Sequence, residues 1–207
     1  MITVIDYGMG NLRSVVKAVE KFTDRVAVSD DPGSIARSKA LIMPGDGAFG
    51  MAMENLKKRG WIGPITEYLA RDGCFLGICL GFQLLFSSSE EFGHHEGLGV
   101  ISGKIVRFRA GELKVPHMGW NTVELASSSG FFSGIASGSY FYFIHSYYPE
   151  IEDRSWVVGE AEYGKKFPCI VGKGNIVATQ FHPEKSHTVG LKIIENFVRL
   201  CADNTSH

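Results

Sequence analysis

A cysteine flanked by two glycines marks the place where the chain changes from a strand-like pattern to a helical one. Residues 73–76 are short and apolar enough to form a buried strand, and leucines recur at helical spacing after residue 79. Cys79 therefore lies at a strand-to-helix turn, with Gly77 two residues before it and Gly81 two residues after it. Side chains at the flanking positions would crowd the crossing of strand and helix, and the central residue has a strained backbone. The pattern predicts a nucleophile elbow.

Two interpretations of Cys79 stay open on this segment alone. Amides at the start of the helix would favour the thiolate over the thiol, which suits a nucleophile. The alternative is a buried core cysteine between two incidental glycines, because the chain contains 25 glycines. The other motifs of the chain have to decide between the two.

Short apolar runs alternate with helical patterns in the first half of the chain. Strands are predicted over residues 2–5, 25–28 and 40–43, and helices over residues 12–22, 32–37 and 62–71. This alternation predicts a parallel sheet with helices on both faces, and Asn11 is the expected N-cap of the first helix. Active sites of such sheets lie at the carboxyl ends of the strands, where Cys79 and the loop after Met43 are both expected.

Strand-like segments follow one another without helices between them in the second half. They span residues 104–108, 121–125, 140–146, 156–163, 169–172 and 176–181. A final helix is predicted over residues 188–201, and no linker, repeat or low-complexity tract interrupts the chain. We therefore predict a single α/β domain over residues 1–207. Its central sheet is mostly parallel or mixed and flanked by helices, with an antiparallel extension in the C-terminal half.

Charge, hydropathy and cysteine spacing argue against several classes of binding partner and favour one cellular compartment. With 21 Lys and Arg against 22 Asp and Glu, the net charge of −1 gives no case for binding nucleic acid or an anionic membrane. The first residues lack the pattern of a signal peptide, and no apolar run reaches the roughly 18 residues of a membrane span. The four cysteines form no C-x-x-C pair, so neither a zinc site nor a disulfide framework is expected. We expect a cytoplasmic protein with free thiols.

The loop over residues 44–50 contains a literal G-x-G-x-x-G, which invites a dinucleotide-binding interpretation. That fingerprint needs an acidic residue about 20 positions later at the end of a strand, whereas Glu67 lies in a predicted helix. Asp46 would also place a carboxylate among amides meant for pyrophosphate. The segment is better interpreted as a flexible loop beside Cys79, whose amides can face a developing oxyanion.

A cluster of possible metal ligands, His94-His95-Glu96, lies in a polar, glycine-rich stretch. Three consecutive side chains cannot all face one metal ion, so residues 87–99 are expected to form a solvated loop. We expect neither a metal nor a cofactor.

A second chemical motif follows the strand predicted near the C-terminal end, where the chain reads His182-Pro183-Glu184. A cysteine nucleophile needs a base that takes its proton, and a third group that fixes the tautomer of that base. His182 and Glu184 can supply both from one rigid element. A surface histidine followed by Pro-Glu usually has no function by itself. Because Cys79 and His182 each supply what the other lacks, we interpret them as a catalytic pair.

Together these motifs resemble those of class I, triad-type glutamine amidotransferases. Residues 77–83 read Gly-Ile-Cys-Leu-Gly-Phe-Gln, and His182 follows Cys79 by 103 residues. Within that family, residues 6–13, 116–121 and 143–148 are similar to segments of the glutaminase subunits of imidazole glycerol phosphate synthases. The resemblance covers almost the whole chain and implies the flavodoxin-like α/β fold of the family.

The resemblance implies a reaction and a role for each catalytic residue. Cys79 would attack the side-chain amide of glutamine and release ammonia, leaving a thioester that water hydrolyses to glutamate. His182 would act as general base and acid, and Glu184 would orient it. The backbone N–H of Leu80 and one from Gly45, Asp46 or Gly47 would form the oxyanion hole.

The resemblance also implies which residues hold the amino-acid end of glutamine, namely Gln83, His145, Ser146 and Tyr147. Without the family, Gln83 is an ordinary polar helix residue, and residues 145–148 are a strand end whose aromatic side chains pack on the core. One position departs from the family, because Asp46 replaces a usual valine in the oxyanion loop. A carboxylate that faces a forming oxyanion is unfavourable, so we expect the Asp46 side chain to face away from Cys79.

A lone glutaminase implies a partner that consumes ammonia. By resemblance this partner is a (β/α)₈-barrel cyclase subunit in a heterodimer. It would use ammonia to convert a phosphoribulosyl-formimino aminoimidazole carboxamide ribotide into imidazole glycerol phosphate, for histidine synthesis, and an aminoimidazole carboxamide ribotide. The expected partner-facing residues are Asn11, Arg13, Trp120 and Asn121, although each could be internal packing instead. We expect weak glutamine hydrolysis until the loaded cyclase reorganises the loop over residues 45–50.

Two other functions stay open. The same glutaminase chemistry could feed a different amidating synthase, with a nucleotide or sugar acceptor. A non-catalytic interaction module with this fold is disfavoured, because such a module has no need of Cys79, His182 and Glu184 together.

Overall fold

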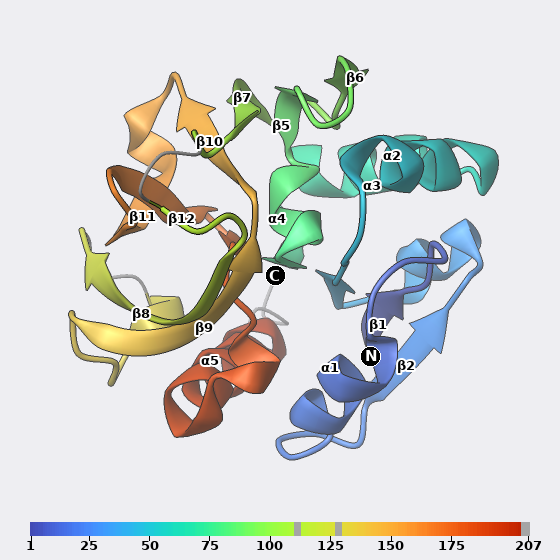
Figure 1. Ribbon diagram of the computed structural model, residues 1–207. Helices are drawn as coiled ribbons and strands as arrows, with labels where there is room; N and C mark the ends of the chain where they lie inside the picture. The colour runs from blue at the N-terminus through green and yellow to red at the C-terminus, as the bar shows by residue number, and fades with distance from the viewer. Residues whose placement is uncertain (110–112, 127–129, 204–207) are drawn as a thin grey trace.

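A nine-stranded sheet forms the centre of the computed structural model, which describes residues 1–109, 113–126 and 130–203 (Figure 1). Five neighbouring strands are parallel, in the order β2 (Val26–Ser29), β1 (Ile2–Ile5), β3 (Ala40–Met43), β4 (Cys74–Ile78) and β13 (Ile176–Thr179). The sheet continues antiparallel through β12 (Lys166–Lys173), β11 (Val157–Glu162), β8 (His117–Leu125) and β9 (Ser139–His145). The predicted α/β class and its antiparallel C-terminal extension are therefore confirmed.

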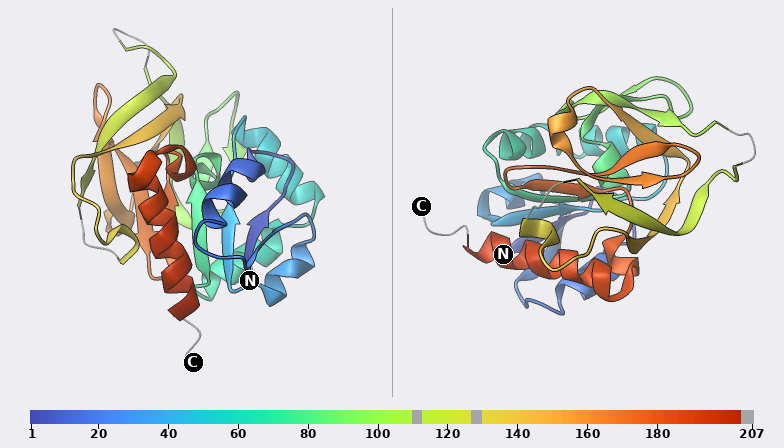
Figure 2. Two further views of the ribbon diagram at one scale, coloured as in Figure 1. Left: turned by 90° about the horizontal axis from the view of Figure 1, so that it is seen from below. Right: turned by 90° about the vertical axis from the view of Figure 1, so that its left-hand side faces the viewer.

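Helices cover both faces of the parallel strands. Successive side chains of a strand point to opposite faces, and nearly every residue of the central strands β1, β3, β4 and β13 is apolar and buried. Helices α1 (Leu12–Val19) and α5 (His187–Asp203) lie beside each other on one face, where they pack on side chains such as Ile42 and Leu76 (Figure 2). Helices α2 (Phe49–Lys58) and α3 (Ile62–Ala70) cover the other face, packing on side chains such as Leu41 and Phe75. The short helix η1 (Pro32–Arg37) joins this second layer.

The helix ends show which local predictions were correct. Asn11 caps α1 as predicted, since its side chain accepts a hydrogen bond from the N–H of Ser14. Helix α2 was not predicted, because the glycine-rich loop was taken to extend to Gly50. Its N-terminus lacks a local cap and is instead capped by Glu91, whose carboxylate accepts from the Phe49 N–H at 2.7 Å.

A second, four-stranded sheet was not predicted. It has the order β10 (Tyr147–Ile151), β7 (Ile101–Arg107), β5 (Phe86–Ser89) and β6 (His95–Glu96). The prediction of a solvated loop over residues 87–99 is therefore wrong in part, since β5 and β6 lie there and the His95 ring packs over Gly50. Strands β5 and β6 are short and polar, and Pro149 interrupts the pattern of β10, which is an edge strand.

Three short 3₁₀ helices complete the described chain, namely η2 (Gly130–Phe132), η3 (Arg154–Trp156) and η4 (Pro183–Lys185). No helix of the described residues is long and apolar enough to cross a membrane.

The expectation that the cysteines form no disulfide framework missed one bond. Cys74, at the start of β4, forms a disulfide with Cys201, near the end of α5, with 6.1 Å between their Cα atoms. Cys79 and Cys169 are free and buried. The paired residues are 127 positions apart, so only the packing of α5 across the sheet brings them together, and local cysteine spacing carries no sign of it.

Candidate active site

Cys79 has the backbone conformation of a nucleophile elbow. It follows β4 and precedes the one-turn helix α4 (Leu80–Gln83), with φ at +55°, a region that a non-glycine residue enters only under strain. The flanking glycines are required by close packing, since a Cβ at Gly81 would overlap the Met43 carbonyl oxygen and one at Gly77 would press on the Gly81 carbonyl. The N–H of Cys79 donates to the carbonyl of Thr179 at 2.8 Å, which ties the elbow to β13.

Contrary to the expectation from the sequence, the amides at the start of α4 do not face the Cys79 sulfur. The N–H groups of Phe82 and Gln83 both donate to the carbonyl of Cys79, at 3.1 and 3.2 Å. The N–H of Leu80 donates to the carbonyl of Gly45, at 3.4 Å. These three amides are thus used by backbone carbonyls, and none of them donates to the Cys79 sulfur.

The loop after β3 holds the oxygen rather than the nitrogen of a peptide group toward α4. Gly45 presents its carbonyl to Leu80, and it packs against Tyr7, whose buried hydroxyl donates to the Pro44 carbonyl at 2.8 Å. Asp46 accepts a hydrogen bond from the Gly10 N–H at 3.1 Å. No hydrogen bond joins the Asp46 carboxylate to Cys79 in the described residues, in agreement with the expected orientation away from the sulfur.

His182 follows β13 and is held by the carboxylate that the sequence places two residues later. Its Nδ1 lies 2.8 Å from Oε1 of Glu184, and both side chains are buried. Nε2 of His182 is buried and has no hydrogen-bond partner in the described residues. Burial by itself lowers the pKa of His182, but the negative charges of a Cys79 thiolate and of Glu184 outweigh it and raise the pKa to about 10. An imidazolium facing a thiolate is the arrangement of a cysteine nucleophile with its acid–base partner.

Cys79 and His182 border one cavity of about 360 Å³ at the carboxyl ends of β3, β4 and β13. Its other lining residues are Asp46, Gly47, Leu80, Gln83, Glu91, Pro116, Ile144, His145, Ser146, Tyr147 and Lys185. Glu91 and Lys185 were not predicted as site residues. Glu91 follows a polar run after β5 that carries no motif, so the sequence gives no signal for it.

Gln83 is buried, and its amide nitrogen is fully used inside the protein. Nε2 donates to the carbonyl of Tyr147 at 3.3 Å and to Oε1 of Gln180 at 3.0 Å. Only the amide oxygen of Gln83 is left to contact a bound molecule, as an acceptor. Gln180, which was not predicted, has its own Nε2 3.9 Å from the Cys79 sulfur.

His145 does not offer a free ring nitrogen to the cavity. Its Nδ1 lies 2.7 Å from the Tyr147 carbonyl, and its Nε2 lies 2.9 Å from Nδ1 of His117. Nε2 of His117 lies 3.3 Å from Nδ2 of Asn121, whose oxygen accepts from the Thr122 N–H. Asn121 therefore donates to His117, His117 to His145, and His145 to Tyr147, which requires both rings to be neutral.

Burial gives the same protonation state to this histidine pair. It lowers the pKa of His117 to about 4 and the pKa of His145 to about 3. His145 thus acts on the cavity through the Tyr147 carbonyl that it holds, and not through direct contact by a ring nitrogen.

The four expected partner-facing residues fall into two groups. The side chains of Asn11 and Asn121 are hydrogen-bonded within the chain: Asn11, which is exposed, caps α1, and Asn121 donates to His117 and to the Glu162 carbonyl. Arg13 is exposed, and Trp120 is 46% exposed with its ring stacked on His187. Two further exposed apolar residues of the same β8–β9 ribbon, Met118 and Tyr140, extend the surface around Trp120.

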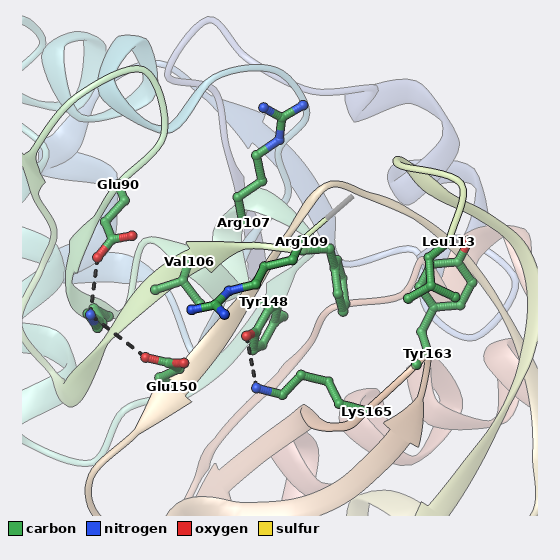
Figure 3. A pocket seen from close by; sticks show the side chains of 12 residues that line it. Glu90, Val106, Arg107, Arg109, Leu113, Tyr148, Glu150, Tyr163 and Lys165 are labelled. Carbon is green, nitrogen blue, oxygen red and sulfur yellow. Dashed lines mark hydrogen bonds and ion pairs between the residues drawn. The ribbon is translucent and has the colours of Figure 1, made fainter. Parts of the chain in front are cut away.

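A larger cavity of about 650 Å³ lies on the other side of β10 (Figure 3). Tyr147 lines the first cavity and Tyr148 lines this one, where Lys165 donates to the Tyr148 hydroxyl at 2.9 Å. Lys104 is paired with Glu90 and Glu150, as the dashed lines in Figure 3 mark. Among the described residues, the lining of this larger cavity contains no cysteine, serine or histidine, so the smaller cavity is the candidate active site.

Comparisons with known proteins show which family the chain resembles over almost its whole length. The sequence model of the family described as Glutamine amidotransferase class-I matches residues 3–201. The imidazole glycerol phosphate synthase subunit HisH of Syntrophotalea carbinolica is 51% identical over 203 residues, which cover 95% of this chain and 98% of that protein. HisH of Methanocaldococcus jannaschii is 48% identical over 204 residues, covering 97% of this chain and 100% of that protein.

Solved structures share the fold at much lower sequence identity. A crystal structure of a glutamine amidotransferase matches with a TM-score of 0.74 and 19% identity, covering 98% of this chain and 100% of the other. PurLQS from Thermotoga maritima matches with a TM-score of 0.76 and 17% identity, covering 96% of this chain and 97% of the other. This likeness shows the fold alone.

Proposed function

Since this chain belongs to the class-I glutamine amidotransferase family, we propose that it is the glutaminase subunit of an imidazole glycerol phosphate synthase. It hydrolyses glutamine to glutamate and ammonia for histidine biosynthesis. The observation that carries the proposal is the strained Cys79 in one cavity with His182, whose Nδ1 is held by Glu184 at 2.8 Å.

The first half of the reaction breaks the amide bond of glutamine. The Cys79 thiolate attacks the side-chain carbonyl carbon, a C–S bond forms, and the carbonyl electron pair moves to the oxygen. The imidazolium of His182 gives a proton to the amide nitrogen. The C–N bond then breaks, ammonia leaves and a thioester remains on Cys79. The buried Glu184 supports this step, because it stabilises the protonated ring and fixes Nε2 toward the cavity.

The second half hydrolyses the thioester. Neutral His182 takes a proton from water, and the hydroxyl attacks the thioester carbon. The C–S bond breaks with its electron pair on sulfur, which restores the thiolate, and glutamate leaves. The imidazolium is restored at the same time, so the pair is ready for another turnover.

Glutamine is oriented by polar groups around the cavity. One carboxylate oxygen of Glu91 is used by the Phe49 N–H, and the carboxylate can attract the α-ammonium group of glutamine. The free oxygen of Gln83 accepts from the same end of the substrate. Ser146 and Tyr147 border the cavity at the junction of β9 and β10.

The oxyanion hole is incomplete in this conformation, because the Leu80 N–H is bonded to the Gly45 carbonyl. Rotation of the peptide between Gly45 and Asp46 would free that donor and turn the Asp46 N–H toward the substrate. Gly47, with φ at +96°, gives the loop the freedom for such a change. We assign to this peptide the switch by which a loaded partner raises the glutaminase rate.

The partner in this proposal is a barrel-shaped cyclase subunit that consumes ammonia, bound as a heterodimer. The exposed Met118, Trp120 and Tyr140 on the β8–β9 ribbon support such an interface, because a group of exposed apolar side chains marks a protein–protein contact. In this proposal the complex works in the cytoplasm.

Ammonia transfer separates this function from that of a glutaminase that serves a different synthase. The chain is mixed with a purified imidazole glycerol phosphate cyclase and its ribotide substrate, with ¹⁵N-amide glutamine as the nitrogen source. We expect ¹⁵N in the imidazole product. Glutamate release without labelled imidazole, in a complex that forms, would contradict the histidine-pathway assignment.

A further inference from the structure

We propose that Gln180 is a catalytic residue, which stabilises the Cys79 thiolate with its side-chain amide and is oriented by a buried hydrogen-bond chain that starts at β8. This inference rests on the proposed glutaminase function and adds to the reacting centre a residue outside the Cys-His-Glu triad.

The contact is between the Gln180 amide nitrogen and the nucleophile itself. Nε2 lies 3.9 Å from the Cys79 sulfur, and Gln180 is completely buried. Its backbone is fixed, because its N–H donates to the carbonyl of Cys169 at 2.8 Å. The backbone amides of α4 that could have faced the sulfur donate to carbonyls instead. Among the described residues, the side-chain N–H that donates to the sulfur is that of Gln180, which directly follows β13.

The orientation of the Gln180 side-chain amide is determined by the hydrogen bond to its oxygen. Oε1 of Gln180 accepts from Nε2 of Gln83 at 3.0 Å. If the amide were reversed, its NH₂ group would face the NH₂ group of Gln83, and its oxygen would face the thiolate. Both contacts would be repulsive, so Gln83 keeps the Gln180 N–H directed at sulfur.

Gln83 is oriented in turn by a chain that crosses the core. The Tyr147 carbonyl accepts from Gln83 at 3.3 Å and from Nδ1 of His145 at 2.7 Å. His145 accepts from His117, and His117 accepts from Asn121. Each amide and ring in the series has one orientation that satisfies its neighbours. The series begins one residue from the exposed Trp120 and ends at the Cys79 sulfur, so His117 and His145 are positioning residues.

The donor matters in two steps of the reaction. It stabilises the thiolate before the attack on glutamine. It also stabilises the negative charge that returns to sulfur when the C–S bond of the thioester breaks. Because glutamine itself does not contact Gln180 in this scheme, loss of the donor should lower kcat and leave KM almost unchanged.

The test follows the alkylation of Cys79 by iodoacetamide as a function of pH, in the full chain, with the modified residue identified by peptide mass. Gln180→Met removes the donor at nearly constant volume. The matched control is Asn196→Leu, since Asn196 is also a buried amide, with hydrogen bonds to the Phe131 and Ser133 carbonyls far from the site. Gln180→Met and Asn196→Leu both leave the charged and titratable groups that face Cys79 unchanged, namely His182, Lys185, Asp46, Glu91, His145 and Tyr7.

We expect the midpoint of the alkylation profile to move up by about one pH unit in Gln180→Met, with kcat about tenfold lower in the complex, as for a hydrogen bond to a charged group. Asn196→Leu should lose stability but keep the wild-type midpoint. Gln180→Glu keeps an acceptor for Gln83 and places a carboxylate at the sulfur, so its midpoint should move further than that of Gln180→Met.

An unchanged midpoint in folded Gln180→Met or Gln180→Glu, or an equal shift in Asn196→Leu, would overturn the assignment. If neither Gln180 variant folds, the ¹⁵N–¹H signal of the Gln180 side chain in the wild-type chain replaces them. It should shift on alkylation of Cys79, and an unmoved signal counts against the contact. Failure of the glutaminase proposal itself would give a different result, because Cys79 of the wild-type chain would then show no preferential alkylation.

Discussion

The backbone N–H of Leu80 donates a hydrogen bond to the carbonyl oxygen of Gly45, at 3.4 Å. The same N–H is the donor that the nucleophile elbow offers to a substrate oxyanion. Cys79 and His182 border one cavity while this donor is engaged by Gly45. A resting state of this kind spares glutamine until ammonia can be used.

Partner dependence is the first prediction from this geometry. Adding the cyclase loaded with its ribotide substrate should raise kcat for glutamine hydrolysis by about 10²–10³, the usual worth of an oxyanion donor. A coupled glutamate dehydrogenase assay on the chain with and without the loaded partner measures the change. Full turnover by the isolated chain would show that the Gly45–Leu80 bond does not limit the reaction.

The second prediction concerns the orientation of His182. Glu184→Gln keeps the size of the side chain but removes the charge that helps to raise the pKa of His182 to about 10. We expect kcat in the complex to fall by about 10²–10⁴, the typical worth of positioned proton transfer. KM should change little, because Glu184 does not line the cavity that receives glutamine. A loss confined to KM would place Glu184 in substrate binding instead.

The third prediction is a pH dependence of stability from the neutral histidine pair. An unfolded histidine has a pKa of about 6.5, whereas His117 in the fold has a pKa of about 4. Between these two values the unfolded chain binds the proton and the folded chain does not. The free energy of unfolding should therefore fall as pH drops from 6.5 toward 4, by at most about 1.4 kcal/mol per pH unit for each such histidine.

Urea unfolding between pH 7 and pH 5 checks this slope. His117→Phe keeps a ring in the position of the imidazole. It should reduce the slope of the unfolding free energy against pH by an amount that corresponds to at most one proton. The exposed His187 is the control, because His187→Asn tolerates the positive φ of that residue and should leave the slope unaltered. Equal slopes in wild type and His117→Phe would mean that His117 is protonated in the fold.

The fourth prediction concerns the disulfide between Cys74 and Cys201. The intact, purified chain should contain two free thiols, Cys79 and Cys169, when titrated under denaturing, non-reducing conditions. Cys201→Ser should lower the free energy of unfolding by about 2–5 kcal/mol, because the bond closes a loop of 127 residues. Four titratable thiols in the wild-type chain would contradict the pairing.

Local patterns predicted most of the parallel half of the fold and the positions of the triad. The elbow at Cys79 was readable because its steric needs fall on neighbouring residues, and His182 and Glu184 are two positions apart. Gln180, Glu91 and His117 were missed, because each acts through a contact with a residue far away in the sequence. Gln180 meets Cys79 only because β13 pairs with β4. Spacing along the chain holds no trace of that pairing.

The second sheet and the disulfide were missed for the same physical reason. Strands β5 and β6 are too short and polar for a periodicity to identify them, and β10 contains Pro149. Tertiary packing, not local propensity, determines their conformation. The resemblance placed Asn121 at the partner interface, and its side chain donates to His117 and to the Glu162 carbonyl, contacts that no local pattern predicted.

The most direct test of the account is covalent labelling with a glutamine analogue that carries a diazoketone in place of the side-chain amide. In the full chain bound to the loaded cyclase, peptide mass spectrometry should find the label on Cys79, with protection by glutamine and none on Cys169. Cys79→Ala in the same complex should release no glutamate above background. Labelling elsewhere, or glutamate release by Cys79→Ala, would contradict the assignment of Cys79 as the nucleophile.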